Sequence, residues 1–290
     1  MNILITGGNG SIGAYLTKYL SAGHKVLTLS RGMGADLRFD LLEISDHQIA
    51  NILEDKKIDL IIHCAGKIAV DNLDDFKLNS FVLNKFFINE VGRKKRYIVI
   101  NSAAEYPRSG LINEDTAPRP STLYGESKLL QTALCYYYYS NFNIDVQVLR
   151  LSNVITPSLP PRSFIGAVLK AVAEREKGQV LINSLEIERD FLDIRDFCRL
   201  LGVIMVSPSK SFLYNIASGS NISYGEVLNK LKKILQQYNL PNPEVLIENK
   251  NESLNKTACD ISKVVKDYQW RPQYSLEDSL LWCLKERNLL

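Results

Sequence analysis

The sequence is poor in the residues that build metal centres and disulfide frameworks. It has three histidines and five cysteines in 290 residues, and the cysteines lie far apart, at positions 64, 135, 198, 259 and 283. No cysteine pair has the spacing of metal ligands, so we expect neither a metal site nor a set of disulfides. Unpaired cysteines are typical of a reducing compartment, and we therefore expect a cytoplasmic protein.

Long hydrophobic runs and a strong excess of one charge are also missing. No run approaches 18 apolar residues, and a strand-like segment begins at residue 2, so we expect neither a membrane span nor a signal peptide. The net charge is only +3, which gives no reason to expect a nucleic-acid partner. The basic run at 93–96 could bind phosphate, but it precedes the apolar run 97–100, where a solvated loop before a buried strand is the other interpretation.

Strand-like and helix-like segments alternate through the first half of the chain. Apolar residues make up 46% of the sequence, enough for a large core. Nearly continuous apolar strands separated by helices are typical of a parallel sheet that is covered on both faces. We predict strands at 2–6, 25–29, 58–63, 97–101 and 145–151, and helices at 11–22, 45–55, 74–91 and 121–140.

The pattern changes after Asn153, where three prolines mark a loop. Helices are predicted at 163–176 and 223–238, and a strand at 212–216. The fold class is therefore α/β, with a doubly wound parallel (Rossmann) sheet and a smaller, discontinuous α/β substrate domain. We assign 1–152, with a return near 190–217, to the dinucleotide-binding domain, and 153–189 with 218–290 to the substrate domain, with a ligand cleft between them.

A glycine-rich turn follows the first predicted strand. Gly7 permits the tight turn, Gly10 lets the backbone approach a pyrophosphate, and Gly13 lets the helix pack close to the strand. The free N–H groups around Ser11 and Ile12 would face the phosphates at the positive end of the helix dipole. A strand, glycine turn and amphipathic helix in this order favour a dinucleotide site over a plain turn.

Ser102, Tyr124 and Lys128 form a second constellation. Tyr124 and Lys128 are four residues apart, so they share one face of a helix. An ammonium group near a phenol favours the phenolate, and we expect Lys128 to lower the pKa of Tyr124 against the opposing effect of burial. Ser102 ends a predicted strand, where its hydroxyl can polarise a carbonyl while Tyr124 donates or removes a proton.

These motifs resemble the extended short-chain dehydrogenase/reductase family, and within it the branch that acts on nucleotide-diphosphate sugars. The resemblance covers nearly the whole chain. Besides Ser102, Tyr124 and Lys128, the matching positions are the turn 6–13, His-Cys-Ala-Gly at 63–66, Asn79, Arg-Leu-Ser-Asn-Val at 150–154, Arg-Asp-Phe-Leu at 189–192, Tyr-Asn-Ile-Ala-Ser-Gly at 214–219 and Trp-Arg-Pro at 270–272.

The resemblance assigns roles to several residues. It implies that Ser102, Tyr124 and Lys128 are catalytic, with Ser102 and Tyr124 contacting the substrate and Lys128 the cofactor. Asn153 would lie near the sugar diphosphate, and Arg189 would bind a phosphate of the nucleotide, unless it only pairs with a neighbouring aspartate. The implied cofactor residues further include Ala65 and Gly66, and Asp40 and Leu41 near the adenine ring, although Asp40 could instead cap the next helix.

Three other features have a structural interpretation. His63 is expected to be a strand-end residue packed near the cofactor, and Glu105 a carboxylate on a solvent-facing loop rather than a second acid. The tyrosine run 136–139 lies on the helix predicted at 121–140. It fits either ordinary packing or the interface of a homodimer formed through this helix.

The end of the second strand bears on the choice of cofactor. Family members that bind NAD usually place an acid there for the ribose 2′-hydroxyl. This chain has Ser30 and Arg31, which could hold a 2′-phosphate, so we predict a preference for NADP(H) over NAD(H). Asp36 is the alternative, because an irregular loop could return its carboxylate to this position.

The resemblance, with this cofactor, implies net reduction of a nucleotide-diphosphate 4-keto(-6-deoxy) sugar. Dehydratases of the branch usually carry an Asp-Glu pair where this chain has Ala103 and Ala104, which argues against dehydration. The alternatives are a nucleotide-sugar 4-epimerase using NAD(P), a reductase of a carbonyl not linked to a nucleotide, and a non-enzymatic, cofactor-sensing binding protein. The intact Ser102, Tyr124 and Lys128 argue against the sensor, and Asn153 and Arg189 against a substrate without a nucleotide.

Overall fold

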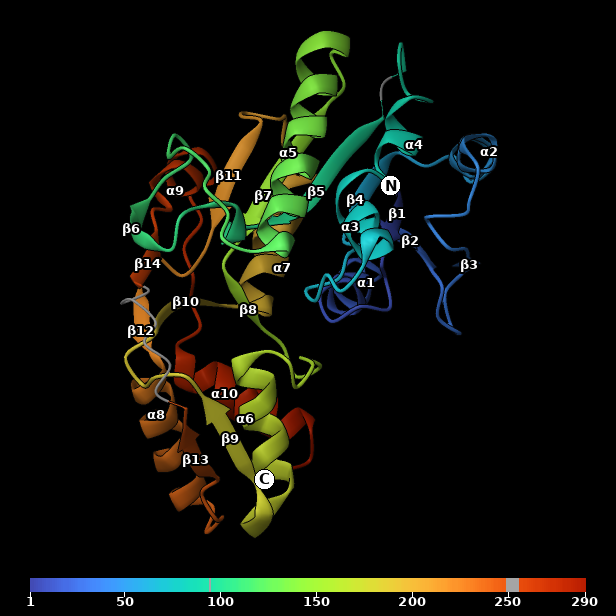
Figure 1. Ribbon diagram of the computed structural model, residues 1–290. Coiled ribbons are helices and arrows are strands. Elements are labelled where there is room, and N and C mark those ends of the chain that lie inside the picture. Colours follow the sequence, from blue (N-terminus) through green and yellow to red (C-terminus); the bar gives the residue numbers. More distant parts are fainter. Residues whose placement is uncertain (94, 249–255) are drawn as a thin grey trace.

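The computed structural model describes residues 1–93, 95–248 and 256–290, and a large parallel sheet of seven strands dominates it (Figure 1). The strand order is β11-β7-β5-β4-β1-β2-β3, and each neighbouring pair is parallel. Every residue of β4 and β7 is buried, as in strands covered on both faces. The strands are β1 (Asn2–Thr6), β2 (Lys25–Ser30), β3 (Leu37–Arg38), β4 (Leu60–His63), β5 (Arg96–Ser102), β7 (Val146–Leu151) and β11 (Leu213–Ile216).

Helices cover both faces of this sheet (Figure 1), and each face has its own hydrophobic core. Successive side chains of β1 alternate between them, since Ile3 packs in one core and Leu4 in the other. Leu16 and Phe197 complete the first core, and Cys135 belongs to the second. The predicted doubly wound sheet is thus confirmed. The helices are α1 (Gly13–Leu20), α2 (Asp46–Asp55), α3 (Leu73–Ser80), α4 (Asn84–Phe87), α5 (Leu123–Phe142), α7 (Ile194–Ile204) and α9 (Ser262–Tyr268).

The remaining elements form smaller sheets and a third core. One sheet has the order β12-β10-β14-β6 with β8 paired to β10, and the other pairs β13 with β9. Val168, Leu231 and Leu284 of three helices pack together in the third core. These elements are β6 (Ser109–Ile112), β8 (Asn153–Ile155), β9 (Gln179–Ile182), β10 (Glu188–Asp193), β12 (Asn221–Ser223), β13 (Glu244–Ile247), β14 (Lys256–Cys259), α6 (Phe164–Ala173), α8 (Tyr224–Gln237), α10 (Leu276–Glu286), and the 3₁₀ turns η1 (Ala103–Glu105) and η2 (Arg175–Lys177).

The structure corrects one helix and adds one strand of the large sheet. The single helix predicted at 74–91 is wrong, because the chain forms α3 and α4 with a turn between them. The hydroxyl of Ser80 donates to the carbonyl of Phe76 at 2.6 Å, and the backbone N–H of Asn84 bonds three residues back, to Phe81. Both contacts compete with the regular helical bonds. The two-residue strand β3 was too short to predict from the sequence.

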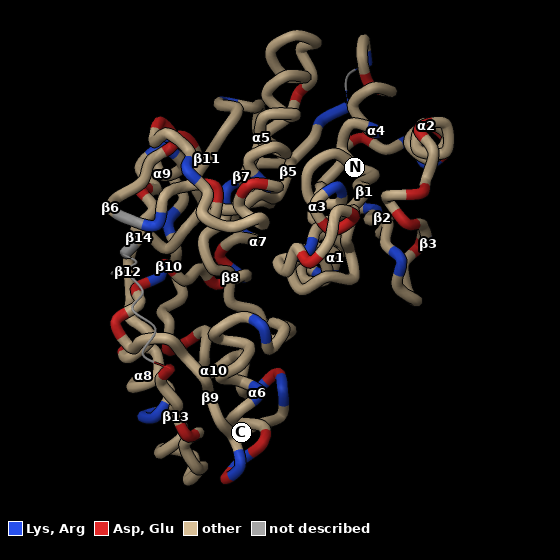
Figure 2. The backbone as a smooth tube through the Cα atoms, viewed as in Figure 1, with Lys and Arg blue, Asp and Glu red and all other residues tan. Residues whose placement is uncertain are grey.

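Charged residues of both signs are interspersed along the backbone, without a large region of one sign (Figure 2). In the basic run, Arg93 forms a 2.6 Å ion pair with Glu54, and Arg96 begins β5 and donates to the carbonyl of Ser207 at 2.5 Å. Lys94 lies outside the described residues, as do 249–255 of the segment 218–290. Within the described residues, no helix combines the length and apolarity needed to cross a membrane.

Candidate active site

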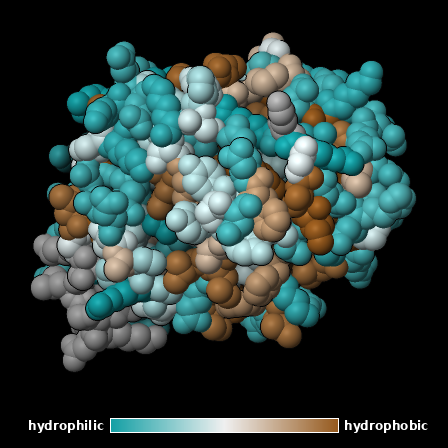
Figure 3. Space-filling model, turned by 90° about the horizontal axis from the view of Figure 1, so that it is seen from above, coloured by the Kyte–Doolittle hydropathy of each residue, from teal (hydrophilic) through white to brown (hydrophobic). Residues whose placement is uncertain are grey.

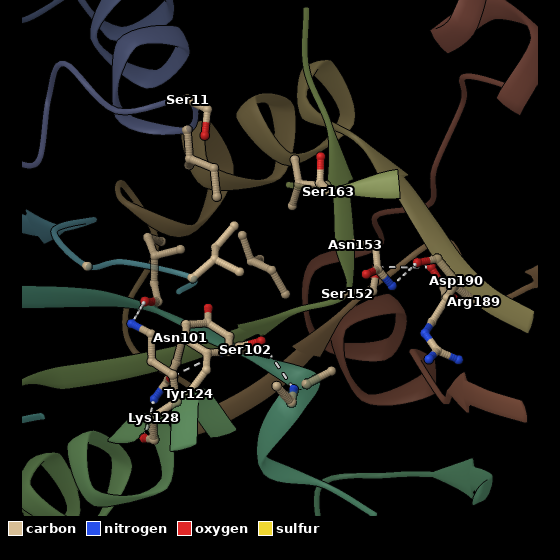
Figure 4. Close-up of a pocket in the computed structure, with 18 of the residues that line it drawn as sticks. Ser11, Asn101, Ser102, Tyr124, Lys128, Ser152, Asn153, Ser163, Arg189 and Asp190 are labelled. Atoms are coloured by element: carbon tan, nitrogen blue, oxygen red, sulfur yellow. Dashed lines mark hydrogen bonds between the residues drawn. The ribbon is translucent and has the colours of Figure 1, made fainter. Parts of the chain in front are cut away.

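Residues from distant parts of the sequence line one cavity of about 530 Å³ at the carboxyl ends of β1, β4, β5 and β7. Ligands bind at this edge in open α/β sheets. In Figure 4, Tyr124 and Lys128 lie beside Ser102, while Asn153 and Arg189 lie together on another wall. The predicted site residues that line the cavity are Gly10, Ser11, Ile12, Gly13, Gly66, Ser102, Tyr124, Lys128, Asn153 and Arg189.

The glycine turn between β1 and α1 leaves no room for side chains at two positions. Gly7 has φ +70°, and its N–H donates to the carbonyl of Leu29 at 2.8 Å. A Cβ on Gly13 would lie 2.2 Å from the carbonyl oxygen of Gly7. The helix starts after Ile12, which provides no side-chain cap. The N–H of Ala14 donates to the carbonyl of Gly10 at 2.9 Å, so the donors left at the cavity among the described residues are the N–H groups of Ser11, Ile12 and Gly13.

A hydrogen-bonded framework joins the end of β5 to α5. Asn101 donates through Nδ2 to the carbonyl of Lys128 at 3.0 Å and to Thr132 Oγ1 at 2.8 Å, and it accepts from the backbone N–H of Ser102 at 2.9 Å. The ammonium group of Lys128 donates to Gln131 Oε1 at 3.0 Å and to the carbonyl of Ile100 at 3.3 Å. Ser102, Tyr124 and Lys128 are thus held on two elements fixed to each other. Sequence reasoning missed Asn101, whose only signal was its place before Ser102.

Burial controls the ionisation of the two titratable groups of this trio. It raises the pKa of Tyr124, an effect that hydrogen bonding with Ser102 opposes and the charge of Glu105 reinforces. It also lowers the pKa of Lys128 to about 8, and Glu105 opposes this shift. The expectation that Lys128 lowers the pKa of Tyr124 is therefore wrong for the protein alone, because desolvation of the phenolate has the largest effect and the hydrogen bond with Ser102 is what opposes it.

Glu105 is buried, which contradicts its assignment to a solvent-facing loop. Its side chain is 0% exposed and forms a 2.6 Å ion pair with Arg150 of β7, whose side chain is 4% exposed. Its other carboxylate oxygen accepts from Thr132 Oγ1 of α5 at 2.9 Å. Arg150 also donates to the Tyr106 hydroxyl at 2.6 Å. Sequence reasoning missed this pair because its members are 45 residues apart and no local pattern couples them.

The opposite wall of the cavity comes from β8 and β10. The amide of Asn153 donates to the carbonyl of Asp190 at 3.0 Å, and Arg189 Nη1 donates to the carbonyl of Glu188 at 2.8 Å. The carboxylate of Asp190 accepts from the backbone N–H groups of Ser218 and Gly219, at 2.7 and 2.9 Å. Asp190 therefore serves to hold the loop after β11, which disfavours the pairing of this carboxylate with Arg189.

The end of β2 carries a hydroxyl and a guanidinium. The buried Oγ of Ser30 has no hydrogen-bond partner in the part of the chain that the structure describes, and Arg31 is exposed, 3.4 Å from Asp40. The carboxylate of Asp36 accepts from both the N–H and the hydroxyl of Thr28 at 2.8 Å, and these bonds lower its pKa. The carboxylate of Asp36 is thus held at Thr28, two residues before the end of β2.

Six predicted cofactor residues lie outside the lining of the cavity: Gly7, Ser30, Arg31, Asp40, Leu41 and Ala65. Leu41 packs in the second core, and a Cβ on Gly7 would contact the backbone of Ala65 at 2.8 Å. Asp40 does not cap α2, because Ser45 is its N-cap. His63 is a buried strand-end residue, as predicted, and its Nδ1 lies 2.7 Å from Thr6 Oγ1.

The chain is similar in sequence to known proteins. A model of the NAD dependent epimerase/dehydratase family matches residues 3–217. The chain is 29% identical over 166 residues to the dTDP-L-rhamnose 4-epimerase of Burkholderia thailandensis, a match that covers 56% of this chain and only 45% of that protein. It is 25% identical over 249 residues to the GDP-6-deoxy-D-mannose reductase of Pseudomonas aeruginosa, covering 81% of this chain and 80% of that protein.

The fold is also found in solved structures. The UDP-glucuronic acid 4-epimerase of Bacillus cereus, in complex with UDP-glucuronic acid and NAD, superposes with a TM-score of 0.86. The superposition covers 99% of this chain and 100% of that chain, at 24% sequence identity. At this identity the likeness concerns the fold, and the choice of reaction depends on the side chains of the site.

Proposed function

Because the chain belongs to the NAD dependent epimerase/dehydratase family, we propose that it is an NADP(H)-dependent reductase of the keto group in a nucleotide-diphosphate 4-keto(-6-deoxy) sugar. One observation carries the choice of reaction. The end of β2 carries Ser30, whose buried hydroxyl has no hydrogen-bond partner in the described part of the chain, and the exposed guanidinium of Arg31, while Thr28 holds the carboxylate of Asp36. A cation with hydrogen-bond donors suits a 2′-phosphate, and a guanidinium suits it best. Preference for NADP(H) favours net reduction, because the cofactor then enters reduced and leaves oxidised.

The turn fits a dinucleotide, since Gly7 and Gly13 carry no Cβ where none would fit, and the N–H groups of Ser11, Ile12 and Gly13 have no acceptor among the described residues. Gly10, Ser11 and Ile12 would hold the pyrophosphate. When bound, the reduced cofactor supplies the hydride. Further out, Ser30 and Arg31 would hold the 2′-phosphate, Asp40 and Leu41 would lie beside the adenine ring, and Ala65, Gly66 and Lys128 would complete the binding surface.

Tyr124 is suited to donate the proton that a keto oxygen needs on reduction. Burial raises the pKa of its phenol, which therefore carries its proton at neutral pH. Ser102 would donate a hydrogen bond that orients the keto oxygen, and the ammonium group of Lys128 would stabilise the phenolate left after proton transfer. Lys128 is charged at neutral pH, since its pKa is about 8.

The substrate would lie against the wall formed by 153–189 and 218–290, our proposed substrate domain. Asn153 and Arg189 line this wall and supply an amide and a guanidinium for the diphosphate. Dehydration is disfavoured, because Ala103 and Ala104 are apolar and the carboxylate of Glu105 is tied to Arg150. The wall and the trio together therefore favour redox chemistry at a sugar carbonyl.

A panel of nucleotide-linked 4-keto-6-deoxy sugars, mixed with NADPH, tests the proposal. Loss of absorbance at 340 nm with one of them supports reduction. Interconversion of sugars without absorbance change rejects the reductase in favour of the epimerase, and tight cofactor binding without either reaction rejects both.

Two variants test the assignments within the site. Tyr124→Phe should lower turnover by about 10²–10⁴-fold while leaving the affinity for NADPH intact. Arg31→Ala should reduce the ratio of NADPH to NADH affinity, and an unchanged ratio would reject the 2′-phosphate assignment.

The second candidate is a nucleotide-sugar 4-epimerase using NAD(P). The observation in its favour is the Asp40 carboxylate, 3.4 Å from Arg31, which partly neutralises the guanidinium. Two of the relatives named above are 4-epimerases. The trio of Ser102, Tyr124 and Lys128 serves either reaction, so the absorbance experiment decides between them.

We also propose that the protein forms a homodimer through α5. Tyr136, Tyr137 and Tyr139 of this helix are 56%, 52% and 42% exposed, and Phe142 at its end is 38% exposed. Figure 3 looks onto the end of the molecule where α4 and α5 lie uppermost in Figure 1, and hydrophobic side chains gather there in several patches. Exposed aromatic residues at this density are typical of an interface.

A further inference from the structure

A buried polar cluster lies directly behind the proposed catalytic trio. At its centre, the ion pair of Glu105 and Arg150 connects η1 to β7. Arg150 lies over the ring of Tyr106 at 4.5 Å and donates to its hydroxyl, which donates in turn to Asn215 of β11 at 2.9 Å. The function proposed above assigns no role to any of these residues.

The carboxylate of Glu105 connects the elements that carry the trio. Glu105 follows Ser102 by one 3₁₀ turn, η1. Its Oε1 accepts from Thr132 of α5, four residues and one helical turn beyond Lys128. Thr132 also accepts from Asn101, whose other contacts are the carbonyl of Lys128 and the N–H of Ser102. A movement of Glu105 would therefore change the distance between Ser102 and the helix that bears Tyr124 and Lys128.

We propose that Glu105 is a positioning residue for the reaction proposed above: its buried carboxylate, anchored by Arg150, fixes α5 against the end of β5 and places a negative charge behind Lys128 and Tyr124. This inference rests on the proposed function only for its effect on turnover. The geometry itself depends on side chains that are 0% and 4% exposed and on three elements of the fold.

The charge of Glu105 acts on both titratable members of the trio. It opposes the burial that lowers the pKa of Lys128, and it adds to the burial that raises the pKa of Tyr124. Glu105 itself is buried, which raises the pKa of its carboxyl, and the Arg150 guanidinium at 2.6 Å pulls that pKa back down. The titratable and charged groups that face Glu105 are Arg150 of β7, Tyr106 of its own loop, and Tyr124, Lys128 and Cys135 of α5.

A purely structural salt bridge would stabilise the fold without moving these ionisations, and Glu105→Gln separates the two roles. The amide keeps the volume and an acceptor for Thr132, but it removes the charge. We expect the alkaline limb of the kcat/KM profile to move to lower pH, because Lys128 then loses its proton more readily. At the alkaline end, kcat/KM should fall by about tenfold relative to the wild type, while KM for the nucleotide sugar, set on the opposite wall, should change little.

A second measurement needs no substrate. The protein is reductively methylated with ¹³C-formaldehyde, and the dimethyl-lysine signal of residue 128 is assigned by its absence in Lys128→Arg. In the wild type this signal should titrate at lower pH than the signals of exposed dimethyl-lysines, because burial lowers the pKa of Lys128. In Glu105→Gln its midpoint should lie at lower pH. A proposed function that is wrong would leave this titration unaffected, so the two failures are distinguishable.

Glu114→Gln is the matched control. Glu114 is a partly buried carboxylate of the same region, and it accepts from the backbone N–H of Asn215 at 2.8 Å. The Glu114→Gln variant should leave both the pH profile of kcat/KM and the titration of Lys128 at the wild-type position. Glu105→Asp, which keeps the charge, should return both readouts toward the wild type.

Thr132→Val keeps the charge but cuts the hydrogen bonds to Glu105 and Asn101. It should lower kcat without moving the alkaline limb, and it provides the test of positioning if Glu105→Gln gives too little folded protein. Superposable pH profiles for Glu105→Gln and wild type, or wild-type kcat in Thr132→Val, would overturn the inference.

Discussion

At the residue scale, burial of ionisable groups sets how this protein responds to pH. Desolvation lowers the pKa of His63 to about 3 and that of Lys128 to about 8, so His63 stays neutral and Lys128 charged at neutral pH. The charge of Lys128 has a smaller effect on the pKa of His63 than desolvation has. The charge of Glu105 likewise has a smaller effect on the pKa of Lys128. Lys128 lines the cavity, and His63 is next in sequence to Cys64, which also lines it. Both side chains therefore keep one protonation state at the site at neutral pH.

Glu90 is a buried carboxylate that the described part of the chain leaves without a hydrogen bond. It is 1% exposed, and neither of its carboxyl oxygens has a hydrogen-bond partner among residues 1–93, 95–248 and 256–290. Burial raises its pKa, with Lys95 and Arg93 opposing the shift. The folded protein therefore binds this proton more tightly than the unfolded chain, so the stability it contributes is intact below about pH 4 and is lost as the pH rises through the raised pKa.

Glu90→Met should consequently stabilise the protein at pH 8. We expect a gain of about 1–2 kcal/mol, the usual cost of an unsatisfied buried polar group, and a gain that shrinks toward pH 4. Urea unfolding at both pH values measures it. Glu54→Gln is the control, since Glu54 is an exposed partner of Arg93 and should change stability little. A stability difference independent of pH would contradict the assignment to Glu90.

The candidate site shows which residues local patterns can reveal. The glycines of the turn, Ser102, and the pair Tyr124 and Lys128 were predictable, because their spacing and strand-end positions carry the signal. The burial of Glu105 was not, since a glutamate after two alanines and before a proline-containing turn usually faces solvent. Only its pairing with Arg150, on a strand far along the chain, makes burial tolerable.

At the element scale, some helices and strands could be predicted from local sequence patterns, whereas others depend on contacts with distant segments. The strands of the large sheet, apart from the two-residue β3, were predictable from apolar runs, and α5 from its length. At the break between α3 and α4, the local bonds of Ser80 and Asn84 are joined by a tertiary contact, in which the ammonium group of Lys85 donates to the carbonyls of Leu42 and Ile44, both at 2.8 Å. The apolar periodicity of residues 74–91 gives no indication of the contact between Lys85 and these carbonyls.

The junction of β1 and α1 gives the second prediction. In Gly13→Ala the new Cβ would lie 2.2 Å from the carbonyl oxygen of Gly7, so the turn must open and its N–H donors must move. We expect the affinity for NADPH to fall at least about tenfold, a loss of about 1.4 kcal/mol. Fluorescence titration with NADPH measures this. The control is Gly23→Ala, beyond the other end of α1, where a Cβ would meet nothing within 4 Å. Equal affinities in the two variants would contradict a phosphate-binding role for this turn.

At the scale of the whole molecule, the smaller sheets were the least predictable part. They are built from short strands that find their partners far along the chain, as when β6 pairs in parallel with β14, joining residues 109–112 to 256–259. Residues 109–112 fall within the segment that we assigned to the dinucleotide-binding domain, and β6 nevertheless completes a sheet of the smaller part. Thr257 and Cys259 of β14 thereby reach the cavity, which no local pattern indicated.

The proposed homodimer depends on the exposed aromatic residues of α5. If the exposed tyrosines of α5 form an interface between two copies, a negative charge in their midst should be costly, because it would be desolvated without a partner. Tyr137, which is 52% exposed and lies edge-on to Tyr138 and Phe142, is the test position. Light scattering after gel filtration should give twice the mass of the chain for the wild type and a single chain mass for Tyr137→Asp.

Tyr238→Asp is the matched control: Tyr238 is 41% exposed at the end of α8, remote in the fold from α5, and this variant should remain a dimer. A wild-type protein that is monomeric at every concentration, or two variants that dissociate alike, would remove α5 as the interface.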